Sequence, residues 1–557
     1  MTKGQYKNLT QTKAYSILAS LADHFSAAKT PASGLAANQI LDLKQLLTPE
    51  RIQNYTIDNG LLKYSYSASL VTDEIITALQ ALADEQQVIP RYQELLSGER
   101  VNLTECRSVQ HHKTRSRSDR GFYGEQQARV SEFASKVRQG LIKGSMGKPF
   151  NHVVQIGIGG SDLGPRAMYL ALQGWALSER EERMGPDYNI LHNRLDGAKD
   201  STYTAGRVIT ADFISNVDPD DANLVLSKID FETTLFIAVS KSGTTQETLT
   251  NLAFVKQKAL ESGIMPEGLS CHFIAVTGKG SPMDNPDLYT ASFYIDDAIG
   301  GRYSSTSVVG GVLLSIAYGA EVFDAFLNGA SSMDNSSLNP DITQNMSLLS
   351  AMIGVWERNF LNFPAKAVIP YSQALIRFSA HLQQLDCESN GKHVNQYGGP
   401  LDYKTSPVIF GEPGTNSQHS FFQMLHQGTD IIPIQFIGFA EPQIVDSEGL
   451  AAESVLNANL IAQIAALALG KDNTDPRKQF DGGRPSSLIY GASLTPSSLG
   501  ALLAFYENAV MFQGFIWNVN SFDQEGVQLG KSLANQLLSE PLSEKDPVLA
   551  GFAAMLS

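Results

Sequence analysis

The sequence predicts an α/β protein with two domains, each a parallel β-sheet flanked by helices. Its 557 residues exceed what one hydrophobic core usually organises. Apolar runs at 152–158 and 235–239 each end in a glycine or serine turn before a helical pattern, and runs at 367–370 and 431–439 repeat this order. Because alternation of strand, polar turn and helix is typical of parallel α/β domains, we expect two such units in series.

The rest of the chain reads as mainly helical. Helical patches at 14–25 and 75–83 indicate a helical N-terminal segment, and a longer helix is expected at about 497–517. The residues after 535 have the pattern of a helical arm. We therefore expect four segments: an N-terminal segment packing on the second domain, a first domain, a second domain, and a C-terminal lysine loop and arm, at residues 1–120, 121–325, 326–520 and 521–557.

Composition excludes several classes of protein. Lysine and arginine total 42 against 57 acidic residues, and the net charge of −15 disfavours nucleic-acid binding. The longest apolar run, near 460–469, contains Gln463 and is shorter than a membrane span, and the N-terminus lacks the apolar region of a signal peptide. Three scattered cysteines form neither a disulfide framework nor a metal cluster. We expect a cytoplasmic protein without a membrane or nucleic-acid partner.

A glycine-rich block follows the first predicted strand. Asp162 stands where a dinucleotide fingerprint needs its third glycine, so the block does not predict nucleotide binding. It predicts a glycine turn that leads from the strand towards Ser161 and Asp162 and can expose backbone N–H groups to a bound oxygen. A plain tight turn is the alternative.

A hydroxyl-rich stretch at 240–248 follows the second predicted strand and precedes a helix. Because the positive end of the helix dipole attracts anions, this stretch is a candidate phosphate site. In a chain with a net negative charge, an anion can be bound only by such local donors. Thr244 and Glu247 also fit a capping box, so the alternative is that these hydroxyls cap the helix.

One glutamate closes a helical segment. Gln384 and Glu388 are one turn apart, on a different face from the apolar residues, and Asn390-Gly391 ends the helix. The apolar residues at helical spacing are Leu375, Phe378, Leu382 and Leu385. Glu388 is a candidate general base at the edge of a cleft. The alternative is a solvated carboxylate at a helix end.

Two further candidates lie in predicted loops. His419 is seven residues from His426, a spacing that does not form a metal-ligand motif. Lys531 follows Gly530 as in a nucleotide P-loop, but Gly526 is one residue too near for that motif. A structural histidine and a solvated lysine are the alternatives.

Five blocks of the sequence together resemble the glucose-6-phosphate isomerase family, in order and spacing, from about residue 120 to 535. They read IGIGGSDLG from 156, SKSGTTQET from 240, GGRYS from 300, LDCESNGK from 385 and GEPGTNSQH from 411. The segment QEGVQLGK from 524 is similar to the lysine segment of the family, except that Glu525 stands where members carry tryptophan or another large residue.

The resemblance implies two sugar-isomerase-type domains, each with three αβα layers, and an aldose–ketose isomerase that needs no metal or redox cofactor. It implies that Glu388 is the base, that Arg302 stabilises developing negative charge, and that Gln384 positions Arg302 or the substrate. It assigns ring opening to His419 and Lys531. Because the histidine of the family comes from the neighbouring subunit, a homodimer is implied.

The resemblance also implies the residues that bind the substrate, with Thr244 more structural than ligating. They are Gly160, Ser161, Ser240, Lys241, Ser242, Thr245, Gln384 and Gln524. Two rival functions stay open at this point. One is a sensor that binds a sugar phosphate without transforming it, and the other is an isomerase for mannose 6-phosphate or an amino sugar.

Overall fold

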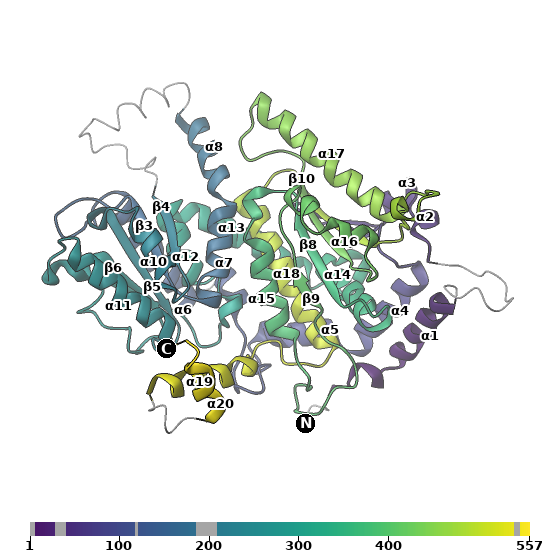
Figure 1. The fold of residues 1–557 in the computed structure, drawn as a ribbon, viewed down its shortest axis with the longest axis horizontal. Coiled ribbons are helices and arrows are strands. Elements are labelled where there is room, and N and C mark those ends of the chain that lie inside the picture. Colours follow the sequence, from purple (N-terminus) through teal and green to yellow (C-terminus); the bar gives the residue numbers. More distant parts are fainter. Residues whose placement is uncertain (1–5, 28–40, 117–120, 185–208, 540–545, 557) are drawn as a thin grey trace.

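The computed structural model describes residues 6–27, 41–116, 121–184, 209–539 and 546–556, which form two sheets surrounded by helices (Figure 1). The first sheet is entirely parallel, with β3 and β5 at its centre. Its order is β4 (Thr210–Ile214), β3 (His152–Ile156), β5 (Thr234–Ser240), β6 (Phe273–Thr277) and β7 (Ala291–Tyr294). This sheet confirms the strands expected at 152–158 and 235–239.

Helices cover both faces of the first sheet. Alternate strand residues point to opposite faces: Val154 packs with α10 (Pro219–Leu226) and α11 (Gln246–Glu261). Val153 instead joins the core that contains α6 (Phe122–Arg138), α7 (Leu163–Ala171) and α12 (Val308–Ala317). The result is the three-layer arrangement that the sequence predicted.

The second sheet mixes strands from both ends of the chain. Its order is β1 (Thr56–Asp58), β2 (Lys63–Ser65), β11 (Ser486–Gly491), β10 (Ile434–Phe439), β8 (Ala365–Pro370) and β9 (Val408–Phe410). The four strands from β11 to β9 are parallel, whereas β2 pairs with β11 in the antiparallel sense. The N-terminal segment thus adds a hairpin to the second sheet, which its mainly helical pattern did not predict.

The remaining helices fill the core and the outer layer. In the first part of the chain these are α1 (Lys13–Ala27), α2 (Leu43–Leu46), α3 (Pro49–Asn54), α4 (Asp73–Glu85), α5 (Val88–Ser97), α8 (Gln173–Met184) and α13 (Ala320–Ser336). Those that follow are α14 (Met346–Val355), α15 (Phe378–Asn390), α16 (Phe422–Gln427), α17 (Ser447–Leu469), α18 (Pro496–Ile516), α19 (Gln528–Ser539) and α20 (Pro547–Ala553). The helices expected at 14–25, 75–83 and 497–517 and in the C-terminal arm are confirmed. The four segment boundaries stay a prediction.

Two described helices, α17 and α18, are long and apolar enough to cross a membrane. Helix α18 is buried along its length and packs on α13, α14 and α15, which identifies it as a core helix. Helix α17 contacts β10, β11 and α2 through one side, while Val455 and Ile461 on its surface are 63% and 64% exposed.

Candidate active site

Glu388 lies in the last turn of α15, one turn beyond Gln384. The helix ends at Asn390 because Gly391 turns back on it: a Cβ at Gly391 would lie 2.4 Å from the Cys387 carbonyl oxygen. Two buried acceptor atoms of this face, Gln384 Oε1 and Glu388 Oε2, have no hydrogen-bond donor among the described residues. Such atoms are available to the hydroxyl groups of a ligand.

Arg302 faces this carboxylate from the short 3-10 helix Gly301–Tyr303, which follows β7. Its Nη1 lies 3.6 Å from Glu388 Oε2, with the two side chains 1% and 18% exposed. The guanidinium is fixed elsewhere: Nε donates to Ser389 Oγ at 2.6 Å, and Nη2 donates to the carbonyls of Ser521 and Asp523 at 2.6 and 3.0 Å. A buried, held cation beside a carboxylate can stabilise negative charge on a substrate oxygen.

The glycine turn after β3 packs directly on the Arg302 segment. An added Cβ at Gly160 would lie 2.2 Å from the Gly301 carbonyl carbon, so only glycine permits this approach. Gly159 has a φ of +61°, and a Cβ there would lie 3.4 Å from the amide nitrogen of Gln384. The turn therefore brings Gly160 and Gln384 to the site.

One expectation for this turn is wrong. The N–H groups of Ser161 and Asp162 are not turned toward a ligand, because they donate to the carbonyls of Ile158 and Gly159 within the turn. These bonds close the 3-10 helix Gly159–Ser161. The Ser161 side chain is half-buried.

The candidate phosphate loop connects β5 to α11. Ser240 Oγ lies 2.9 Å from Thr245 Oγ1 and accepts the N–H of Gly243 at 3.1 Å. Ser242 Oγ accepts from the hydroxyl of Thr244 at 2.9 Å. The loop is thus a compact set of hydroxyls at the N-terminus of a 16-residue helix, where the dipole favours an anion.

The capping box predicted for this helix is wrong. The N-cap residue is Thr245, one position later than Thr244, and no side chain caps the helix. Thr244 bonds to Ser242 instead. Its structural role is inside the loop, and the first N–H groups of α11 have no side-chain cap.

Lys241 joins the phosphate loop to the Arg302 segment. Its Nζ donates to the carbonyls of Asp297 and Ile299 at 2.7 and 3.0 Å. Burial, with a smaller effect of the nearby Arg107 cation, lowers the pKa of Lys241 to about 8. The lysine therefore remains mostly protonated at neutral pH and can pair with a phosphate.

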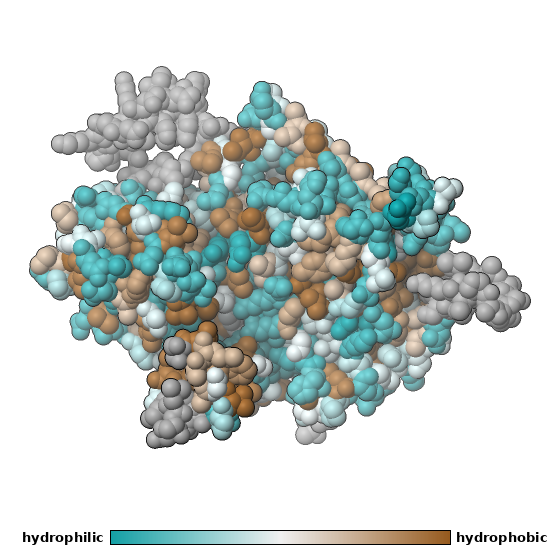
Figure 2. Space-filling model, viewed as in Figure 1, coloured by the Kyte–Doolittle hydropathy of each residue, from teal (hydrophilic) through white to brown (hydrophobic). Residues whose placement is uncertain are grey.

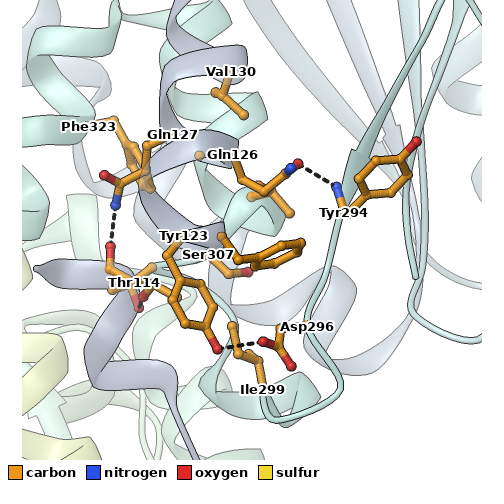
Figure 3. Close-up of a pocket in the computed structure, with 14 residues that line it drawn as sticks. Thr114, Tyr123, Gln126, Gln127, Val130, Tyr294, Asp296, Ile299, Ser307 and Phe323 are labelled. Atoms are coloured by element: carbon orange, nitrogen blue, oxygen red, sulfur yellow. Dashed lines mark hydrogen bonds between the residues drawn. The ribbon is translucent and has the colours of Figure 1, made fainter. Parts of the chain in front are cut away.

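The segment that accepts from Lys241 is supported by α6. Figure 3 shows the Tyr123 hydroxyl bonded to Asp296, at 2.8 Å, and the Gln126 side chain accepting the N–H of Tyr294, at 2.9 Å. Together with Ile299 these residues line a small internal cavity next to the Arg302 segment. These hydrogen bonds from α6 fix the position of the chain between β7 and Arg302.

His419 is the last residue of a short 3-10 helix, Asn416–His419, and is exposed. Its segment is anchored at the carboxyl end of β8, where Gln418 bonds to the Tyr371 hydroxyl at 2.6 Å. A Cβ at Gly411 in the same loop would lie 3.2 Å from Ser379 Oγ, at the beginning of α15. At 1.5 Å per residue, Glu388 is roughly 13 Å further along this helix. Among the described residues, no contact joins His419 to Glu388 of the same chain, and the loop of His419 is anchored near the beginning of α15 whereas Glu388 is in its last turn.

Gln524 and Lys531 begin the exposed C-terminal arm. The chain is buried from Trp517 to Asp523, and every residue from Gln524 to Lys531 is exposed. Among the described residues, the Lys531 ammonium has no hydrogen-bond or ion-pair partner. Glu525, the departure from the family pattern, is exposed in the 3-10 helix Glu525–Val527.

The two domains contribute to the site in different ways. Ser240 is the last residue of β5, and Gly160 and Arg302 follow the carboxyl ends of β3 and β7, as expected for parallel sheets. Glu388 instead comes from the end of α15, a whole helix beyond β8. The second domain thus contributes Glu388 from the end of a helix and not from the end of a strand.

Several residues of the site went unnoticed in the sequence. Ser389 accepts a hydrogen bond from Arg302 and lies 3.0 Å from the Tyr303 hydroxyl, and Lys392 and Asp523 form a 2.7 Å ion pair. Their contacts run mainly to backbone and supporting atoms, for which sequence spacing gives no signal. No group of three or more potential metal ligands occurs among the described residues.

Comparison with known proteins agrees with this geometry. The phosphoglucose isomerase family model matches residues 65–550. Glucose-6-phosphate isomerase of Treponema denticola is 50% identical to this chain, and the match covers 99% of this chain and 100% of that protein. Glucose-6-phosphate isomerase of Desulfotalea psychrophila is 44% identical, and the match covers 97% of this chain and 96% of that protein. The crystal structure of a Chlamydia trachomatis glucose-6-phosphate isomerase has a TM-score of 0.84 at 40% identity, with 99% of each chain covered. The chain belongs to the phosphoglucose isomerase family.

Proposed function

We propose that Glu388 is the base with which this glucose-6-phosphate isomerase interconverts glucose 6-phosphate and fructose 6-phosphate. The observation that carries the assignment is the pair of Glu388 and Arg302, 3.6 Å apart beside Gln384 and Gly160. Glu388 removes the C2 proton of the open-chain aldose and returns it to C1 through an enediolate. Arg302 stabilises the negative charge that develops on the oxygens.

The phosphate group binds at the N-terminus of α11. Ser240, Ser242 and Thr245 supply hydroxyl donors, and Lys241 supplies the cation that an acidic chain must place locally. Lys241 also contacts the segment that leads to Arg302. Binding of the phosphate therefore places the sugar against the catalytic pair.

The closed sugar ring must open before proton transfer, and we assign this step to His419 and Lys531. His419 is exposed, and its loop is anchored near the beginning of α15 through Gln418 and Gly411, whereas Glu388 is in the last turn of this helix. This separation supports a site that combines Glu388 of one subunit with the histidine of a second copy of the chain. We therefore propose a homodimer.

The exposed apolar surface also supports a homodimer. None of the residues of α19 and α20 is buried, and Leu529, Leu538 and Phe552 are each at least 66% exposed. Figure 2 shows hydrophobic residues gathered over these two helices. Val455 and Ile461 of α17 add a second apolar surface. A second copy that covers these helices would bury them and bring Gln524 and Lys531 into a packed environment.

Two rival functions make different predictions from this one. A non-catalytic sensor would need neither a base nor a buried cation, yet Glu388 and Arg302 are both positioned. A coupled assay with glucose, mannose and glucosamine 6-phosphates distinguishes this function from that of an isomerase for mannose 6-phosphate or an amino sugar. We expect turnover of glucose 6-phosphate to exceed that of the other two by orders of magnitude, and comparable turnover of a rival sugar would contradict the assignment.

We also propose that the enzyme works in the cytoplasm, in glycolysis and gluconeogenesis. Cys106, Cys271 and Cys387 are all free, which fits a reducing compartment. Fractionation of cells with an antibody against the chain would test this location.

A further inference from the structure

A half-buried lysine, Lys392, joins the helix of the proposed base to the beginning of the arm that carries Lys531. Lys392 stands two residues after α15, and its Nζ donates to the Glu388 carbonyl at 3.1 Å. The same ammonium donates to the Asp523 carbonyl at 3.0 Å and pairs with Asp523 Oδ1 at 2.7 Å. One cation therefore contacts the backbone of Glu388 and the residue directly before Gln524.

Asp523 is the last buried residue before the arm. It is 6% exposed, and the eight residues that follow it are exposed. Its other carboxylate oxygen accepts from the Thr104 hydroxyl at 2.7 Å, and its carbonyl also accepts from Arg302. Asp523 is thus held by three side chains, and these contacts fix the point from which Gln524 and Lys531 extend.

Lys392 also binds the C-terminal end of α15. A carbonyl in the last turn of a helix has no intrahelical partner, and the Lys392 ammonium satisfies that of Glu388. A cation at this end also interacts favourably with the helix dipole. Arg302 and Lys392 together connect the Glu388 end of α15 to residues 521–523.

We infer that Lys392 and Asp523 are a pair of positioning residues that set the arm carrying Gln524 and Lys531 relative to Glu388. The inference rests on the proposed roles of Glu388 and Lys531. Neither member of the pair touches the reacting atoms. Because ring opening and proton transfer act on one bound sugar, a displacement of the arm by an ångström would separate the groups that perform the two steps.

The test compares Lys392→Met with Lys63→Met in the full-length protein. Lys63 forms a surface pair with Asp58 at 3.1 Å and provides a matched control. We expect Lys392→Met to lower kcat for glucose 6-phosphate roughly 10- to 100-fold while KM changes little, because the phosphate site is intact. Hydrogen exchange of residues 521–531 should become faster in this variant and stay unchanged in Lys63→Met.

Asp523→Asn provides the second variant, since it keeps an oxygen acceptor but removes the charge. It should reproduce the effect on exchange and kcat, and the double variant should be no worse than the stronger single one. Unchanged exchange in folded Lys392→Met and Asp523→Asn would overturn the inference. Faster exchange with unchanged kcat would overturn the coupling to catalysis. A parallel Lys531→Ala variant that retains full activity would show that the proposed role of Lys531 has failed instead.

Discussion

The Arg302 guanidinium lies 3.6 Å from the Glu388 carboxylate, although the two residues come from different domains and different kinds of element. Arg302 reaches this position from a turn after β7, and Glu388 from the last turn of α15. The arginine is fixed by Ser389 and by two backbone carbonyls, so its position does not depend on the glutamate. A preorganised cation next to a base is what enediolate chemistry requires.

The contact between the glycine turn and the Arg302 segment should be sensitive to one methyl group. Gly160→Ala would place a Cβ 2.2 Å from the Gly301 carbonyl carbon, so the Arg302 segment must shift. We expect kcat to fall on the order of 100-fold. Gly551→Ala is the control, because nothing lies within 4 Å of a Cβ there. Equal activity of the two variants would show that the contact does not position Arg302.

Removal of two hydroxyls from the phosphate loop should weaken the binding of every ligand that carries a phosphate group. We expect the double variant Ser240→Ala, Thr245→Ala to bind inorganic phosphate and sugar phosphates at least about tenfold more weakly, since hydrogen bonds to charged groups contribute roughly 1.5–3 kcal/mol. Calorimetry measures both affinities. Ser262→Ala changes a hydroxyl at the opposite end of α11 and should have no effect. An unchanged phosphate affinity in the double variant would refute the assignment of this loop.

Phosphate affinity should also depend on pH through Lys241. Because the pKa of this lysine is lowered to about 8, its charge is present below that pH and is lost as the pH rises through it. We expect the Kd for inorganic phosphate to increase between pH 7 and pH 9. The Lys241→Met variant should bind more weakly at pH 7 and lack this increase in Kd, because phosphate itself only gains charge over the range. A wild-type profile that parallels that of the variant would contradict the role of Lys241.

Subunit mixing tests whether His419 acts across an interface. Glu388→Gln and His419→Ala are each expected to be inactive, but a mixed dimer has one site with neither defect. Random mixing at equal amounts should restore about one quarter of the wild-type activity. Unfolding and refolding the two variants together, then assaying, measures this. If the histidine serves its own chain, every site keeps one defect and no activity returns.

The ends of the helices and strands that carry much of this site could be predicted, because they depend on short-range sequence patterns. The end of α15 at Asn390-Gly391 and the strands before Gly157 and Ser240 follow from spacing, breakers and apolar runs. The β1–β2 hairpin was missed because two three-residue strands carry little periodic signal and pair with a strand near the other end of the chain. The capping box failed by one residue, within the usual uncertainty of helix boundaries.

The contacts that complete the site depend on tertiary packing. Nothing local predicts that Lys392 reaches both Glu388 and Asp523, or that Ser161 uses its N–H within the turn. His419 illustrates a different limit. Its loop is recognisable in sequence, but no contact within one chain joins it to Glu388, and its action across a subunit interface is a proposal that the mixing experiment tests.

The role of Glu388 as the base is tested most directly by comparing turnover and binding in Glu388→Gln. The substitution keeps the size of the side chain and removes the group that takes the proton. We predict that the dissociation constant for fructose 6-phosphate changes little, while kcat falls by at least the roughly 10²- to 10⁴-fold that a lost general base costs. Isomerisation within a few-fold of the wild-type rate would contradict the central claim.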